Sequence, residues 1–158
     1  MAFNKSIHMI YLILLGITAG ATLTVGALVA PVVFGANAYL ASAHLDTFDA
    51  GLLMTQVFIR YNYLLAVTVG IVLVMEIRDY LRFNRDKWTV GLAFVVLFTG
   101  MMFLFYYTPY ILQAQAMGPA ATQTELFDNV HKGAELDHKI LLAALLGLAG
   151  RRLWRTLR

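Results

Sequence analysis

Long apolar runs alternate with short polar stretches along the whole chain. A helix needs about 20 residues to cross the hydrocarbon of a bilayer, and three of the runs reach that length. A fourth run, residues 140–150, is too short alone, but it becomes long enough when the polar stretch HKGAELDHK at 131–139 is included. We therefore expect an all-α fold, an integral membrane four-helix up-down bundle forming one domain over 1–158, with spans at about 7–34, 53–77, 88–110 and 130–151.

The composition supports a membrane location. Hydrophobic residues make up 60% of the chain and charged residues 13%, against about 45–50% and about 25% in ordinary soluble domains. The absence of cysteine excludes disulfides, thiolate metal sites, iron–sulfur clusters and covalent haem attachment. The sequence has no nucleophile–base motif, phosphate loop or dinucleotide fingerprint, so we expect neither an enzyme nor a nucleic-acid partner.

The positive charges predict the orientation. Of the twelve Lys and Arg residues, nine lie near the N-terminus, in the 78–87 loop or in the C-terminal tail. Arg60, Lys132 and Lys139 fall on the opposite side. Because Lys and Arg are concentrated in cytoplasmic loops, both termini should be inside a bacterial inner (cytoplasmic) membrane.

The polar stretch before the fourth apolar run carries the candidate chemistry. On a helix, His131, Glu135 and His138 lie within about 60° of one another, whereas Asp137 and Lys139 point elsewhere. Two imidazoles and a carboxylate could ligate a divalent metal, relay protons or form a structural hydrogen-bond network. We favour the network, and the other two interpretations stay open.

Arg60 is the expected partner of this stripe, because it lies at a similar outer depth on the second helix. A guanidinium there needs a carboxylate, so it should either lock two helices together or contact an anionic ligand. Tyr110 could line the same outer cavity. The carboxylates available to Arg60 are Asp46, Asp49, Glu135 and Asp137.

Histidine placement limits the cofactors. A copper site of His44, His131, His138 and a methionine is conceivable, but the spacing does not support it. Haem is disfavoured, because His44 is in a loop and His8 starts on the opposite side of the membrane. The cofactor is therefore unknown, with a divalent metal or copper as the candidates.

Small residues predict helix packing. Gly16 and Gly20 form a small-xxx-small pair, Gly147 lies on the fourth helix, and Pro31 permits a kink near the outer end of the first. Besides the lipid bilayer, a second copy or a membrane-complex partner could dock on these faces.

Several short motifs resemble one known family. They are LTVGALVAPVVF at 23–34, Ala50-Gly51 followed by Phe58, Phe127-x-x-x-His131, and His8. The chain is similar to a bacterial four-helix membrane family, domain of unknown function 4149, related to animal transmembrane protein 205. The resemblance implies membrane proteins without a settled activity, and the association of the animal relative with platinum-drug resistance implies metal or drug export. The residues that match are His8, Pro31, Phe34, Gly51, Phe58 and His131, whereas His44, Glu135 and His138 do not.

These observations predict a non-enzymatic membrane protein with an outward-facing polar pocket. The pocket would bind or transport a small ligand, with a metal ion as the first candidate. An accessory or structural subunit of a larger membrane complex is the alternative, and a haem or quinone redox protein is a third. The residues expected in the pocket are Arg60, His131, Glu135, Asp137 and His138.

Overall fold

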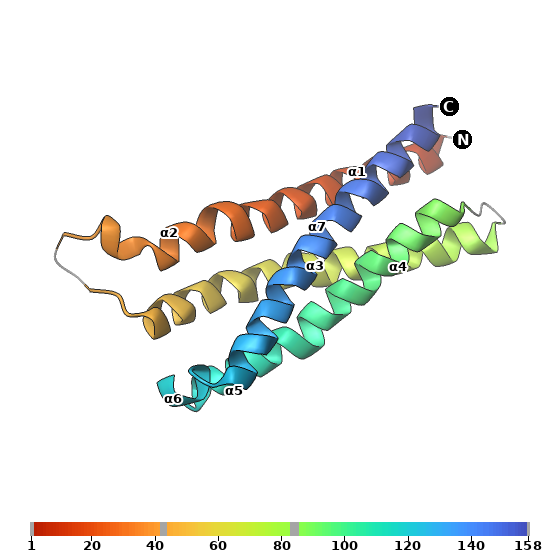
Figure 1. Cartoon of the computed structure of the whole chain (residues 1–158). Coiled ribbons are helices and arrows are strands. Elements are labelled where there is room, and N and C mark those ends of the chain that lie inside the picture. The colour runs from red at the N-terminus through yellow and green to blue at the C-terminus, as the bar shows by residue number, and fades with distance from the viewer. Residues whose placement is uncertain (1, 42–43, 83–85, 158) are drawn as a thin grey trace.

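The computed structural model describes residues 2–41, 44–82 and 86–157, and these residues form helices without any strand. Four long helical rods dominate the chain (Figure 1). The first combines α1 (Ala2–Leu23), η1 (Thr24–Val29) and α2 (Ala30–Phe34); the second is α3 (Thr47–Leu81); the third combines α4 (Lys87–Met102), η3 (Phe103–Tyr107) and α5 (Thr108–Ala116); the fourth is α7 (Glu125–Leu157). Two short helices, η2 (Ala36–Ala38) and α6 (Pro119–Thr122), lie in the connections.

Three of these rods are long and apolar enough to cross a membrane, over Ser6–Phe34, Thr47–Leu81 and Lys87–Ala116. The expectation of an all-helical membrane protein is therefore confirmed, with helices that extend beyond the predicted spans. The fourth rod is 33 residues long, but it is not among the apolar spans. Its first half carries the polar stretch, which interrupts the apolar character that the other rods maintain.

Aspartates begin two of the long helices. The Oδ1 atom of Asp46 accepts a hydrogen bond from the backbone N–H of Asp49 at 2.7 Å at the start of α3. Asp86 does the same for Thr89 at 3.0 Å at the start of α4. Each cap satisfies a backbone donor that the first turn leaves without a partner. Asp46 and Asp49, predicted as pocket partners, therefore belong to a helix cap.

Two rods contain a widened π-helical turn, and a proline follows each turn. Pro31 comes shortly after η1 and Pro109 shortly after η3. A proline inside a helix lacks an N–H and its ring crowds the preceding turn, so a widened turn accommodates it. The backbone N–H of Ala30 bonds to the carbonyl of Val25, and that of Thr108 bonds to Phe103.

The rods pack most closely at the end that holds both termini and separate toward the other end (Figure 1). There α7 lies against α1 and α4, and α3 lies against both as well. Gly147 permits the α4 contact, since a Cβ at this position would lie 3.0 Å from the side chain of Leu92. Gly16 and Gly20 face open space instead.

Buried threonines join the first two rods. Thr18 bonds to Thr68 and Thr22 bonds to Tyr61, each at 2.7 Å between hydroxyl oxygens. Hydrogen bonds between helices supply specificity where lipid offers no competing polar partner. Together with the surrounding apolar core, they fix α1 against α3 beside the candidate site.

Candidate ligand-binding site

A cavity of about 520 Å³ lies where α2 and α7 diverge. Residues of α3, η3 and α5 also line it, and most of its lining is apolar. Its edges are surface residues of the first and fourth rods, so it opens between them on the side of the molecule. A second hollow of about 230 Å³ adjoins it and shares Phe34, Met54, Thr55, Phe58, Ile111 and His131 with it.

His138 forms the polar wall of this cavity. Its Nε2 atom lies 2.9 Å from the backbone carbonyl oxygen of Thr22, just before the widened turn η1. Because a carbonyl can only accept, Nε2 carries the proton, and Nδ1 is the acceptor of the neutral ring. Nδ1 is buried without a hydrogen-bond partner among the described residues.

A glycine and three aromatic rings surround His138. A Cβ at Gly26 would lie 3.2 Å from Cδ2 of the imidazole, so a larger residue here would require the ring to shift by a few tenths of an ångström. The rings of Phe58, Tyr61 and Phe103 lie 5.5 to 5.7 Å from the imidazole between centroids. The histidine is therefore held in one orientation, with its polar contact on the first rod.

The edge of the cavity on α7 is charged. Glu135 lies between two groups of the same helix, His131 Nε2 at 3.5 Å and Lys139 Nζ at 4.0 Å. His131 also stacks on Phe127, with ring centroids 5.9 Å apart and planes 9° from parallel. All three ionisable residues line the cavity together with His138. The prediction that Lys139 points away from His131, Glu135 and His138 is therefore wrong, because it lies one turn after Glu135 and so on nearly the same face of the helix.

Other predicted site residues lie elsewhere. Arg60 is exposed and donates to the backbone carbonyl of Gln56 at 2.8 Å, and its expected carboxylate partner is not found in the described part of the chain. His44 is exposed in the connection before α3. Tyr110 stacks on Phe127 with ring centroids 6.5 Å apart, outside the cavity lining. Within the described ranges, no three His, Asp or Glu side chains gather as a metal site would require.

Asp137 differs from its prediction as a pocket partner. Only 8% of it is exposed, it does not line the cavity, and its Oδ2 atom has no hydrogen-bond partner among the described residues. It lies within electrostatic range of Tyr61 and Tyr107. The cause is helix geometry, since a residue one position before His138 points about 100° away from it.

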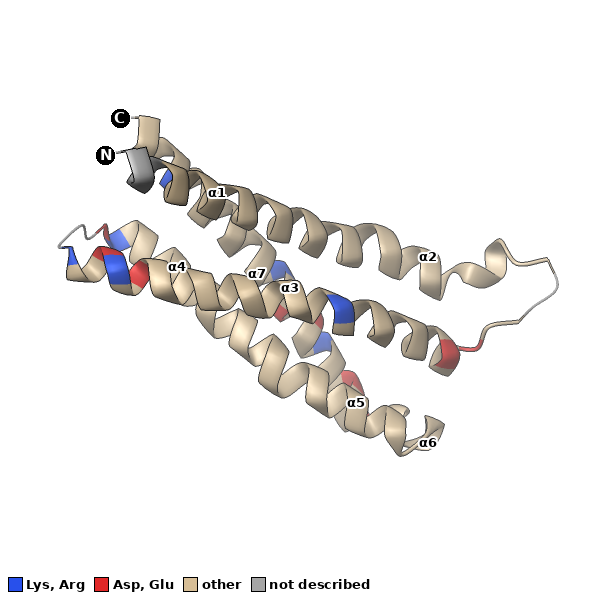
Figure 2. Cartoon of the chain, turned by 180° about the vertical axis from the view of Figure 1, so that it is seen from behind, with Lys and Arg blue, Asp and Glu red and all other residues tan. Residues whose placement is uncertain are grey.

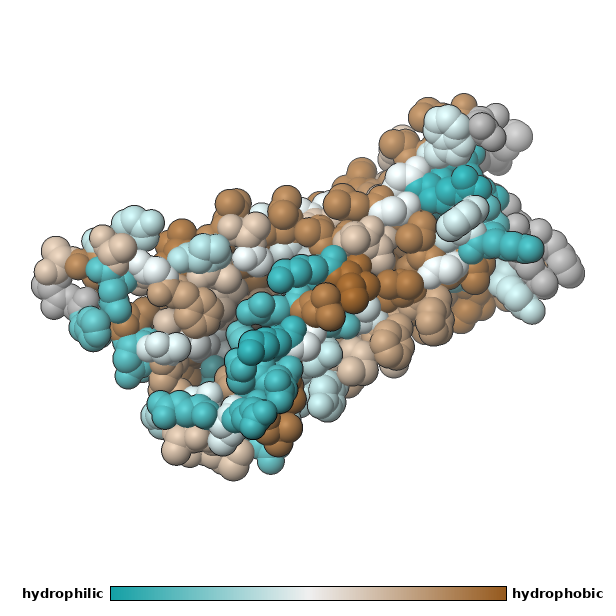
Figure 3. All heavy atoms as spheres, viewed as in Figure 1, coloured by the Kyte–Doolittle hydropathy of each residue, from teal (hydrophilic) through white to brown (hydrophobic). Residues whose placement is uncertain are grey.

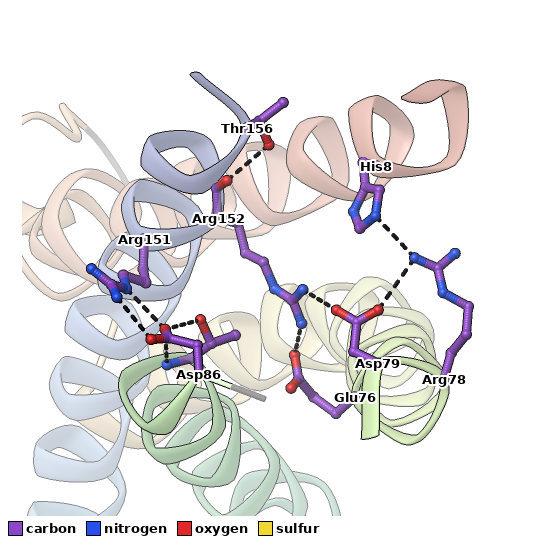
Figure 4. Close-up of polar contacts among 9 residues, drawn as sticks. His8, Glu76, Arg78, Asp79, Asp86, Arg151, Arg152 and Thr156 are labelled. Carbon is purple, nitrogen blue, oxygen red and sulfur yellow. Dashed lines mark hydrogen bonds and ion pairs between the residues drawn. The ribbon is translucent and has the colours of Figure 1, made fainter. Parts of the chain in front are cut away.

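A second polar cluster ties the ends of the rods together (Figure 4). The guanidinium of Arg152 on α7 donates to Glu76 and Asp79 on α3 and lies 5.6 Å from the ring centroid of Tyr11. Arg78 joins Asp79 at 3.5 Å and His8 at 3.1 Å. The carboxylates have matched cations, so this cluster holds α7 in place and leaves no site for a ligand.

Beside this cluster, Arg151 donates two hydrogen bonds to Asp86, at 2.9 and 2.7 Å. These bonds and those from Thr89 lower the pKa of Asp86 below its usual value. The pair therefore connects the last turns of α7 to the start of α4.

Several cavity residues escaped the sequence analysis. They are Thr22, Gly26, Thr55 and Phe103, for which the sequence predicts no role in a site. One signal was available for Gly26, because it precedes Pro31 by five residues in a helix that a proline must disturb. The other three residues have no distinguishing pattern within uniformly apolar spans.

A comparison with known protein families gives one match, which covers most of the first three rods. The model of the family described as "Domain of unknown function (DUF4149)" matches residues 13–120, so the chain belongs to this family. The matched part includes the walls of the cavity on α1, α2, α3 and α5, whereas α7 follows it in sequence. No curated protein and no solved structure matches the chain.

Proposed function

For this member of the DUF4149 family, we propose a non-enzymatic membrane protein that binds a small apolar or amphipathic molecule in the cavity between α2 and α7. One observation carries the proposal: an apolar cavity of about 520 Å³ meets a fixed histidine and a charged edge. Small-molecule sites measure about 300–1,000 Å³ and combine apolar walls with a few fixed polar groups.

The ionisable groups of the lining all lie on α7, which would orient a bound molecule. Its apolar part would contact Met54, Phe58 and Phe103, and its polar part would face His131 and Glu135. The Nδ1 atom of His138 is itself buried, so the groups that face a ligand are His131, Glu135 and Lys139. An orienting wall of this kind favours an amphipathic molecule over a purely apolar one.

A bound metal ion finds less support. His138 uses Nε2 for the Thr22 carbonyl, which leaves the His131–Glu135 pair as the nearest two ligands. Structural zinc sites use four protein ligands and catalytic sites use three. Elemental analysis of the purified protein beside His131→Ala should find no stoichiometric metal that the substitution removes.

We also propose that α7 crosses the membrane and completes a four-helix up-down bundle with both termini in the cytoplasm. Lys and Arg residues gather at the end that holds the termini (Figure 2). The positive-inside preference places such an end on the cytoplasmic side of the membrane. Since the chain has no cysteine, single cysteines are clean topology reporters. Thr156→Cys should resist an impermeant thiol reagent in intact cells and Gln123→Cys should react; the reverse pattern would invert the orientation.

Photolabelling tests the binding proposal. A fatty acid that carries a diazirine, photolysed with the detergent-purified protein, should label peptides that line the cavity. Ala27 lines the cavity, so Ala27→Phe should block this labelling. Leu28→Phe is the matched control, because Leu28 is next to Ala27, is 63% exposed and lies outside the lining. Equal labelling of wild type and Ala27→Phe would refute the proposal.

A role as an accessory subunit remains a second candidate. Gly16 and Gly20 lie on an exposed face of α1 with open space above them. Paired small residues of this kind let another transmembrane helix approach closely. Purification in mild detergent distinguishes the possibilities, since a lone monomer would count against both a complex partner and a homo-oligomer.

A further inference from the structure

The charged edge of the cavity lies at a depth where charge needs a polar neighbour. Glu135 and Lys139 are exposed on α7 beside the cavity. A hydrophilic band follows the first half of α7 on this face of the molecule (Figure 3). If α7 spans the bilayer, Glu135 lies about one turn deeper than His131 and Lys139 about two turns deeper. Ionisable groups within a membrane pair with one another or mark a binding site. Their own contact, 4.0 Å between Lys139 Nζ and Glu135 Oε2, is long for an ion pair, so both can take a further partner.

The two charges differ in sign and their tips converge. Side chains on a helix lean toward its N-terminus, which brings the ammonium of Lys139 up toward Glu135. His131 reaches Glu135 from the other side at 3.5 Å. The edge therefore offers one cation and one carboxylate side by side, so its complement is a group that carries an anion and a cation together.

The cavity as a whole, with its charged edge included, has the length of about one leaflet. Along α7 its lining runs from His131 to Leu142, which corresponds to about 16 Å at 1.5 Å per residue. Half of a hydrocarbon core of about 30 Å is about 15 Å. The lining includes exposed residues on both rods, such as Ala27 and Lys139, so the cavity is open between them and a chain could enter from the bilayer without crossing water.

We propose that the occupant is a phospholipid with an ethanolamine headgroup, taken from the leaflet opposite the chain termini. One acyl chain lies against Phe58, Phe103 and Leu142, the phosphate accepts from Lys139, and the ammonium donates to Glu135. This inference rests on the proposed function and specifies the ligand of the same cavity.

Other headgroups fit the edge less well. Phosphatidylglycerol supplies an anion for Lys139 but no cation for Glu135. Phosphatidylcholine carries both charges, but its quaternary ammonium has no N–H to donate to the carboxylate. Charge-assisted hydrogen bonds are about twice as strong as neutral ones, so the primary amine should decide the preference.

Native mass spectrometry with defined lipids tests this inference. The delipidated protein is titrated with palmitoyl-oleoyl phosphatidylethanolamine, phosphatidylglycerol or phosphatidylcholine. We expect one phosphatidylethanolamine per chain, bound about tenfold more tightly than the other two. Glu135→Gln should abolish the preference, and Lys139→Gln should weaken binding of all three lipids.

The same helix provides a matched control. Asp128 and Lys132 form an ion pair of 2.6 Å on α7, and neither lines the cavity. The double substitution Asp128→Asn/Lys132→Gln removes the same kinds of charge one to two turns away, so it should leave the lipid preference unchanged. A loss of preference in this control would show a general charge effect and overturn the inference.

The remaining outcomes separate the inference from the proposed function. Tight binding without headgroup preference, still blocked by Ala27→Phe, would overturn the lipid assignment and leave the cavity function standing. Lipid binding that Ala27→Phe leaves unchanged would overturn both. A dimer that protects Glu135 from carbodiimide labelling would identify a second copy as the occupant and overturn the lipid assignment.

Discussion

The buried arginine at the end of α7 gives the sharpest test of how the rods are held together. Arg152 is 5% exposed, and its two terminal nitrogens donate to Glu76 and Asp79 on α3. Its guanidinium also lies 5.6 Å from the ring centroid of Tyr11 on α1. One side chain thus joins three rods, and Arg152→Ala would leave two carboxylates close together without their cation.

The expected cost follows from burial. Removing one partner of a buried ion pair costs about 3–5 kcal/mol, because the remaining charge stays out of water and unpaired. For a domain of this size, each kcal/mol lowers Tm by about 2–4 °C. We therefore expect Arg152→Ala to lower Tm by about 6–20 °C. Adding Asp79→Asn to this variant should recover part of the loss, since it removes one of the two stranded carboxylates.

Thermal unfolding in a mild detergent, followed by circular dichroism, measures this effect. Arg151→Ala is the matched control, because the neighbouring arginine is about a third exposed and pairs with Asp86 at the rim. Pairs that water reaches contribute little to stability. If Arg152→Ala lowered Tm no more than Arg151→Ala, or if Asp79→Asn deepened its loss, the assignment of Arg152 as a buried anchor would be wrong.

Three further predictions concern single positions. The pKa of Asp86 is lowered in the fold, chiefly by hydrogen bonds from Arg151. The stability that the Asp86 carboxylate contributes should therefore be complete at neutral pH and disappear as acidification protonates it. Asp86→Asn should flatten the dependence of Tm on pH below about pH 4. Gly26→Ala should cost about 1–3 kcal/mol in chemical unfolding, because the new Cβ would lie 3.2 Å from the His138 ring; an unchanged midpoint would refute the close approach. Gly118 has φ +94° and ψ −179°, a conformation that essentially only glycine adopts. Gly118→Ala should therefore lower the free energy of chemical unfolding by about 1–3 kcal/mol. An unchanged free energy would contradict this backbone geometry.

The helices could be predicted from the sequence because apolar runs of the required length are visible directly. Their bounds could not, since caps such as Asp46 extend α3 beyond its apolar core, and only the structure shows which polar residue caps. The fourth rod illustrates the limit most clearly. Its polar half satisfies helix periodicity but not the hydropathy of a span, so sequence alone predicts a helix there more firmly than a crossing.

For the site, helical angles correctly placed His131, Glu135 and His138 on one face, because residues on one helix have fixed relative directions. Contacts between helices depend on how the rods rotate and tilt, which local periodicity does not contain. Arg60 therefore found no predicted carboxylate among the described residues and bonds to its own helix at Gln56. The carbonyl partner of His138 was equally invisible, since every residue has a carbonyl and only packing selects Thr22.

The two widened turns explain why the cavity lies where it does. Pro31 and Pro109 each follow a π-helical turn, and these turns belong to the two rods that flank α7. Each turn presents an element of the site, namely Gly26 on η1 and Phe103 on η3, to the same imidazole of His138. Because π turns are rare and costly in a helix, their coincidence at one histidine indicates that the backbone is shaped around this position. Both turns fall within the family-matched residues and His138 follows them in sequence, so the family model covers the two turns but not the histidine that they contact.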